Sequence, residues 1–113
     1  MATITAVETD LGAGFRQVLW ETLTVTNNDG SAVNVKGYNR GTVIIRGTFD
    51  SNTITLEGNI DGTNWATLKD EGGNAISTQD EASFTFNVAC LQVRPLSASG
   101  TTVDVDVDLM LVG

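Results

Sequence analysis

The chain has 113 residues, of which 41% are hydrophobic and 18% are charged. This length and composition predict a single folded domain, residues 1–113, and argue against intrinsic disorder. Six basic residues against fourteen acidic ones give a net charge of -8, so we expect no binding to nucleic acid or to an anionic membrane, because both need clustered lysine and arginine.

From one end to the other, the predicted elements are strands. They are short runs rich in valine, isoleucine, threonine and phenylalanine, separated by glycine, asparagine, aspartate and serine. The expected strands are residues 3–7, 15–26, 33–35, 42–49, 53–60, 65–68, 83–94 and 101–112. About eight strands at this spacing favour an all-β fold, an antiparallel β-sandwich of jelly-roll or immunoglobulin-like type. Residues 1–14 are a candidate for an extended N-terminal arm.

Two of these strands show where the pattern is regular and where it breaks. Residues 53–60 alternate cleanly, with an apolar residue or glycine at each even position, which is typical of a half-buried strand. Residues 83–94 begin with the same alternation, but the apolar phase shifts, which predicts a β-bulge at residues 89–91. Pro95 should end this strand, because proline has no N–H to donate to a ladder.

Three segments are apolar on both faces: residues 18–20, 43–45 and 109–112. A strand in a two-sheet sandwich needs only one buried face. The surplus apolar side chains therefore indicate either a curved sheet covered by loops or a surface that meets another chain.

The last predicted strand, TTVDVDVDLML, places Asp104, Asp106 and Asp108 between apolar residues. The row has three interpretations: a solvated face that also discourages strand pairing, an electrostatic face opposite a basic partner, or a calcium site. Calcium fits worst, because the segment lacks the glycine and the glutamate of an EF-hand loop. On a strand the carboxylates also lie about 6.8 Å apart.

A turn signal, Asp61-Gly62, precedes Trp65. We expect the Trp65 ring to pack over this turn and into the core. The functional alternative is a platform on which a sugar ring stacks. That platform would need a second exposed aromatic side chain, for which Tyr38 and Trp20 are the candidates.

Catalysis is not expected. The chain has no histidine and a single cysteine, so the common Ser-His and Cys-His pairs and histidine-based metal sites are excluded, as is an internal disulfide. Cys90 is expected to be a small apolar side chain in a strand. Carboxylate pairs are present, but a domain of this size has little room for the cleft of a glycosidase. We therefore expect a protein that is not an enzyme and holds no cofactor or metal.

The succession LWETLTVTNNDGSAV, GTVIIRGTFDSNTITLEGNIDGTNWATLKDEGGNAIS and QVRPLSASGTTVDVDVDLML resembles a family of small virion proteins of tailed bacteriophages. The most specific part runs from Gly47-Thr48-Phe49 to Trp65. The DGTNW hairpin is also similar to that of discoidin-type carbohydrate-binding jelly rolls, over about ten residues. The chain departs from the phage pattern at Asn59, where serine is usual, and in its acidic last strand.

The resemblance implies a structural place in the particle. We expect a capsid decoration or cement protein that binds the major capsid protein at subunit junctions, as a homo-oligomer and preferably a trimer. It would be made in the host cytoplasm, since the N-terminal segment lacks the basic leader and apolar core of a signal peptide. Alternatives are a tail or head–tail connector protein and a carbohydrate-binding module on the virion surface. The candidate interface residues are Arg16, Leu19, Trp20, Arg46, Arg94, Asp104, Asp106, Asp108 and Met110. For the three arginines we expect interface ion pairs.

Overall fold

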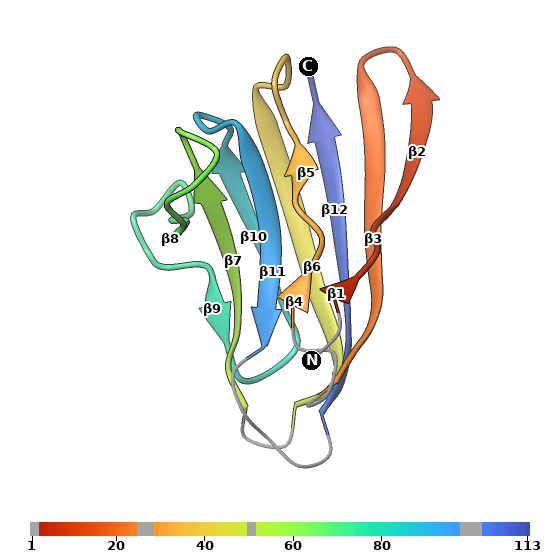
Figure 1. Ribbon diagram of the computed structural model, residues 1–113, viewed down its shortest axis with the longest axis vertical. Coiled ribbons are helices and arrows are strands. Elements are labelled where there is room, and N and C mark those ends of the chain that lie inside the picture. The colour runs from red at the N-terminus through yellow and green to blue at the C-terminus, as the bar shows by residue number, and fades with distance from the viewer. Residues whose placement is uncertain (1–2, 25–28, 50–51, 98–102) are drawn as a thin grey trace.

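The computed structural model describes residues 3–24, 29–49, 52–97 and 103–113. In this part of the chain two β-sheets pack face to face (Figure 1). One sheet has five strands in the order β10-β6-β12-β3-β2, and every neighbouring pair in it is antiparallel. Its strands are β2 (Val7–Gly12), β3 (Phe15–Thr24), β6 (Arg40–Thr48), β10 (Ala82–Asn87) and β12 (Asp104–Val112).

The other sheet is assembled from shorter pieces around β7 and β11. Its main path is β1-β4-β11-β7-β8, with β5 also paired to β11 and β9 also paired to β7. All of these pairs are antiparallel except β1 with β4, which is parallel. The strands are β1 (Thr3–Ile4), β4 (Asp29–Gly30), β5 (Val33–Asn34), β7 (Ile54–Asn59), β8 (Ala66–Thr67), β9 (Ser77–Thr78) and β11 (Gln92–Ser97). We call this the seven-stranded sheet.

One hydrophobic core lies between the two sheets. Alternate residues of β12, from Val105 to Leu111, are fully buried in it. Trp20 is also fully buried, and its indole Nε1 donates a hydrogen bond to the backbone oxygen of Ser31 at 3.0 Å. The expected all-β sandwich is therefore confirmed. It contains more strands than the roughly eight that the pattern predicted. The reason is that most strands of the seven-stranded sheet are only two residues long.

The predicted strand at residues 83–94 is in fact two strands in different sheets. β10 pairs with β6 in the five-stranded sheet, whereas β11 pairs with β7 in the seven-stranded sheet. Residues 88–91 carry the chain from one sheet to the other. The shift in apolar phase is thus a change of sheet, and the β-bulge expected at residues 89–91 is not formed.

Pro95 lies inside β11, opposite Leu56 of β7, so the expectation that it ends the strand is wrong. Leu56 donates its N–H to Ile76 and accepts a hydrogen bond from the N–H of Leu68, so both of its backbone groups point away from β11. Pro95 and Leu56 are therefore a pair that exchanges no backbone hydrogen bonds. The backbone nitrogen of Pro95, which carries no hydrogen, faces the other edge of β11. That edge pairs with β5 and then with β4, and the proline sits between the two pairings.

Residues 3–12 are part of the sandwich, which corrects the expectation that residues 1–14 form an extended arm. β1 joins the seven-stranded sheet and β2 joins the five-stranded sheet beside β3. Between them, Ile4 accepts the N–H of Ser31 at 2.8 Å, and the N–H of Ala6 donates to Ser31 Oγ at 2.9 Å. The chain therefore crosses between the sheets after Ile4.

Gly47, in the block that carries the phage resemblance most specifically, has a conformation that only glycine adopts readily. Its φ is +131°, and a Cβ at this position would collide with the backbone oxygen of Asp104 on the neighbouring strand β12. The glycine thus permits close approach of β6 and β12 at the end of their ladder.

Candidate functional site

The aspartate row lies on the outward side of β12, the central strand of the five-stranded sheet. Burial alternates along β12, so its odd-numbered residues enter the core and its even-numbered residues face outward. Asp104 is exposed, and Asp106 and Asp108 are half-buried. Because β6 and β3 pair with both edges of β12, the row runs along the middle of the sheet. It does not protect an open strand edge.

Apolar side chains surround this row on the same face. The register places Ile44 and Leu19 on either side of Asp108, Val7 next to Leu19, and Phe15 next to Val112. Val7, Phe15 and Ile44 are 55%, 41% and 44% exposed. We call the following residues the outward apolar set: Val7, Phe15, Leu19, Ile44, Met110 and Val112.

The three segments that are apolar on both faces all contribute to this set. The outward members of residues 18–20, 43–45 and 109–112 are Leu19, Ile44, and Met110 with Val112, and all the other members are buried in the core. Ile44 is 44% exposed, so no loop among the described residues covers this part of the sheet. The sequence pattern therefore correctly identified segments with more apolar residues than one buried face needs. The strand register places their outward side chains on one surface.

Asp108 is held in a local polar network at the centre of the face. Gln17 Nε2 donates to its two carboxylate oxygens at 3.2 and 3.3 Å. Arg46 Nη1 lies 3.7 Å from Asp108 Oδ2. The arginine offsets part of the repulsion within the row, which amounts to roughly 2 kcal/mol per neighbouring pair at an effective dielectric of 20. This explains how a half-buried carboxylate is tolerated among apolar neighbours.

The calcium interpretation gains no support. Within the described ranges, no group of three or more His, Cys, Asp or Glu side chains is placed to hold a metal ion. The row follows one face of one strand, so its carboxylates point in the same direction rather than toward a common centre.

Trp20, one of the candidate interface residues, is a core residue. Its side chain is 0% exposed and its N–H is already bonded inside the chain, so it cannot meet a partner in this fold. The segment around it is apolar on both faces, and sequence alone could not tell which of its neighbours points inward.

The three candidate arginines each form an ion pair within the chain. Arg16 pairs with Glu8 at 3.2 Å, Arg46 with Asp108 at 3.7 Å and Arg94 with Glu57 at 3.1 Å. All three pairs are partly exposed, and each is worth about 0–1 kcal/mol. Only Arg46 lies beside the aspartate row.

Trp65 is half-buried, and it lies on the seven-stranded sheet rather than near the aspartate row. The guanidinium carbon of Arg94 lies 4.1 Å from its ring centroid. The preceding turn is closed by Asp61, whose Oδ1 accepts the backbone N–H groups of Thr63 and Asn64 at 2.9 and 2.8 Å. These hydrogen bonds lower the pKa of Asp61 to about 2.

Cys90 packs against the core as a half-buried side chain, and burial raises the pKa of its thiol. The thiol is therefore protonated at neutral pH, which is the opposite of what an activated nucleophile requires. The structure places it as the small apolar residue that the sequence predicted, although it lies just outside β10 and β11.

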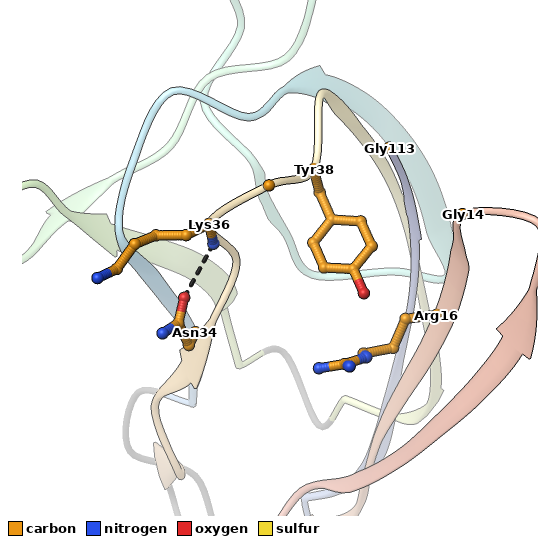
Figure 2. Close-up of a pocket in the computed structure, with 7 residues that line it drawn as sticks. Gly14, Arg16, Asn34, Lys36, Tyr38 and Gly113 are labelled. Atoms are coloured by element: carbon orange, nitrogen blue, oxygen red, sulfur yellow. Dashed lines mark hydrogen bonds between the residues drawn. The ribbon is translucent and has the colours of Figure 1, made fainter.

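A second site, which the sequence did not reveal, lies at the end of the sandwich where β5 turns into β6 (Figure 2). It is an open hollow of about 610 Å³ lined in part by Arg16, Asn34, Lys36 and Tyr38. The Arg16 guanidinium carbon lies 5.7 Å from the Tyr38 ring centroid. The sequence offered one indication of this site. Arg16 lies at an even position of β3, as the core residues Val18 and Trp20 do, so it faces the same side of the sheet.

The solved structures that match this chain include two phage-related proteins. YomS, derived from the SPBc2 prophage, has a TM-score of 0.68 at 18% identity, covering 93% of this chain and 100% of YomS. XepA, an exported protein of PBSX, has a TM-score of 0.67 at 15% identity over 92% of this chain, which spans only 40% of XepA. The chain is a β-sandwich that resembles phage-related proteins.

One cupin-like structure also matches the fold. An RmlC-like cupin protein from Desulfovibrio desulfuricans matches with a TM-score of 0.51 at 8% identity, over 97% of this chain and 82% of the cupin. At these identities the likeness concerns the fold alone. No protein-family model and no curated protein sequence matches the chain. No helix in the described residues has the length and apolar character needed to span a membrane.

Proposed function

We propose that this chain is a capsid decoration protein of a tailed bacteriophage, a non-catalytic virion component made in the host cytoplasm. It binds the outer capsid surface and stabilises junctions between major capsid protein subunits, as a homo-oligomer and preferably a trimer. The sequence resemblance to small virion proteins and the fold shared with two phage-derived proteins support this.

The observation that carries the proposal is the outward face of the five-stranded sheet. A solvated sheet face is usually polar, whereas this one exposes the outward apolar set across four neighbouring strands. Contiguous exposed apolar surface on a small protein marks an interaction site.

The aspartates give this face its electrostatic character. Asp104 is exposed at one end of the row, while Asp108 is already engaged by Arg46 and Gln17. We therefore propose that Asp104 attracts a basic partner surface during association. Asp108 then contacts the partner in the bound complex. Steering of this kind speeds association and weakens as salt rises. Because many copies bind one lattice, modest individual interfaces add up to a large resistance to internal pressure.

The decisive experiment adds purified protein to capsids that lack it. We expect saturable binding at hundreds of copies per particle, a higher capsid melting temperature, and affinity that falls as ionic strength rises. An Asp104→Asn variant should bind with a weaker salt dependence. A count of only a few copies per virion by mass spectrometry would reject decoration in favour of a tail or head–tail connector role.

The carbohydrate-binding alternative is not favoured by the geometry around Trp65. Arg94 already stacks on its ring. Trp20 is buried and Tyr38 lies beside Arg16, so neither candidate for the second aromatic side chain accompanies it. A glycan array probed with the purified protein would test this, and a Trp65-dependent hit would revive the alternative.

A further inference from the structure

Two hollows of different chemistry meet at the end of the sandwich where β5 turns into β6. The first is the open hollow of Figure 2, lined by Arg16 and Lys36 among others. The second, of about 320 Å³, has mainly apolar walls that include Ile60 and Val88. Gly37 and Tyr38 line both hollows, so a single ligand could contact the two.

The side chains that line the first hollow favour an anion, because two of them are basic and none is acidic. The hollow contains two of the six basic residues of a chain whose net charge is -8. Lys36 is exposed and forms no ion pair with any side chain in the described ranges. Glu8 accepts one hydrogen bond from Arg16 Nη1 at 3.2 Å, but a guanidinium has five N–H donors. Arg16 can therefore bind a second carboxylate.

A strand edge borders the first hollow. Val35 donates its N–H to Leu91 of the neighbouring segment at 2.9 Å. Because bonding alternates along an antiparallel pair, the N–H and C=O of Asn34 point away from β11. In the described part of the chain β1 pairs with β4 and β2 with β3, so neither covers this edge. An extended peptide could add to it through main-chain hydrogen bonds.

The second hollow provides an apolar anchor close by. Ile60 is 76% exposed, the highest value among the large hydrophobic side chains of the described residues. Val88 is half-buried beside it. Between the hollows, Gly37 has a φ of +91°, and a Cβ added there would have no atom within 4 Å. The space beside Gly37 is therefore open to a peptide that crosses the loop next to Tyr38.

We propose that this end of the sandwich binds an extended peptide segment of a partner protein. Arg16 holds a carboxylate of the segment, Lys36 adds positive charge on the far side of Asn34 (Figure 2), and a neighbouring apolar side chain packs against Ile60 and Val88. The site is separate from the outward apolar set, so it does not depend on the decoration function.

The test is an NMR titration of the isotopically labelled full chain with acetyl-Leu-Asp-Leu-amide. We expect saturable shifts of the backbone amides of Asn34, Gly37 and Ile60. The matched peptide acetyl-Leu-Asn-Leu-amide should bind at least three-fold more weakly, and sodium acetate should shift Asn34 and Gly37 but not Ile60. Equal binding of the two peptides, shifts confined to the outward apolar set, or no shifts at millimolar peptide would each overturn the proposal.

Exposed substitutions separate the two anchors without disturbing the core. Lys36→Gln should weaken binding of the aspartate peptide by about two- to five-fold, the range for an exposed ion pair, and leave the asparagine peptide unaffected. Ile60→Ser should weaken both peptides. Lys69→Gln makes the same charge change at an exposed site away from the hollows and should change neither. A Lys69→Gln effect equal to that of Lys36→Gln would show that only net charge matters.

Discussion

Arg94 lies over the ring of Trp65, with 4.1 Å between its guanidinium carbon and the ring centroid, while its Nε donates to Glu57 at 3.1 Å. Arg94 and Glu57 are register partners on β11 and β7, whereas Trp65 follows the turn after β7. The stack therefore fastens the turn segment to the outward side of the seven-stranded sheet.

Replacing Arg94 should loosen this attachment. Arg94→Gln removes a cation–π contact worth about 0.5–1 kcal/mol and an ion pair worth about 0–1 kcal/mol. We expect the free energy of unfolding in urea to fall by about 0.5–2 kcal/mol, and the tryptophan emission of the folded protein to change as the Trp65 ring is uncovered. Arg94→Lys keeps the charge but not the planar stack, so a value between Arg94→Gln and the unchanged protein is expected. Loss of stability with no change in emission would contradict the stacking.

Substitution on the outward apolar set should separate folding from docking. Ile44→Ser should lower the free energy of unfolding by less than about 1 kcal/mol, because the side chain is already partly in water. It should nevertheless weaken capsid binding, measured by co-sedimentation. Ile45→Ser, one residue along on the buried side, should cost about 3 kcal/mol or more. Ile60→Ser, exposed at the loop end, should leave capsid binding unchanged. Normal capsid binding by Ile44→Ser would remove this face from the interface.

Asp61 should make the turn sensitive to acid. Its folded pKa is about 2, below the ordinary 3.8, because the backbone N–H groups of Asn64 and Thr63 donate to its carboxylate. A lowered carboxyl pKa means that the stabilisation is present above pH 3.8 and is lost as the pH falls toward 2. An NMR titration of the Asp61 carboxyl carbon should give the low value directly. Asp61→Asn should flatten the pH dependence of stability in this window, and an unchanged slope would show that the turn does not depend on the charge.

Two glycine substitutions separate backbone strain from collision. Gly47→Ala and Gly62→Ala both place a side chain at positive φ, +131° and +80° respectively, but only Gly47 has a backbone atom where the new Cβ must go. Gly62→Ala should cost about 1–2 kcal/mol from backbone strain alone. Gly47→Ala should cost at least about 3 kcal/mol, because β6 and β12 must also move apart. Equal losses in thermal or urea unfolding would mean that the two strands separate easily at this point.

The sequence pattern predicted the two-sheet fold and the inward and outward faces of β12, because strict alternation leaves one register that buries Val105 and Leu109. It also identified the segments whose surplus apolar residues form the outward apolar set. Which segments pair is a long-range property, so the pattern could not show that Ile44, Asp108 and Leu19 lie side by side on three strands.

Other features depend on tertiary context in the same way. Pro95 is tolerated inside β11 because it lies between the residues that pair with β5 and the residue that pairs with β4. The residues around Pro95 in the sequence do not indicate this arrangement. Similarly, the shift in apolar phase between β10 and β11 predicts a β-bulge from sequence alone. Only the sheet topology shows that the two strands belong to different sheets. The hollow around Tyr38 joins side chains from β3 and from the segment after β5, and no spacing between them signals a site.

The central place of β12 also bears on how the molecule is built. Its partner β3 ends at Thr24, some eighty residues earlier in the sequence, and β6 reaches it from the other side. Long-range pairing of this kind slows folding, and until β12 inserts, β3 and β6 each present an uncovered row of amides and carbonyls. During synthesis, a nascent chain that still lacks β12 is therefore prone to self-association, and capture by a chaperone would protect it until the closing strand emerges.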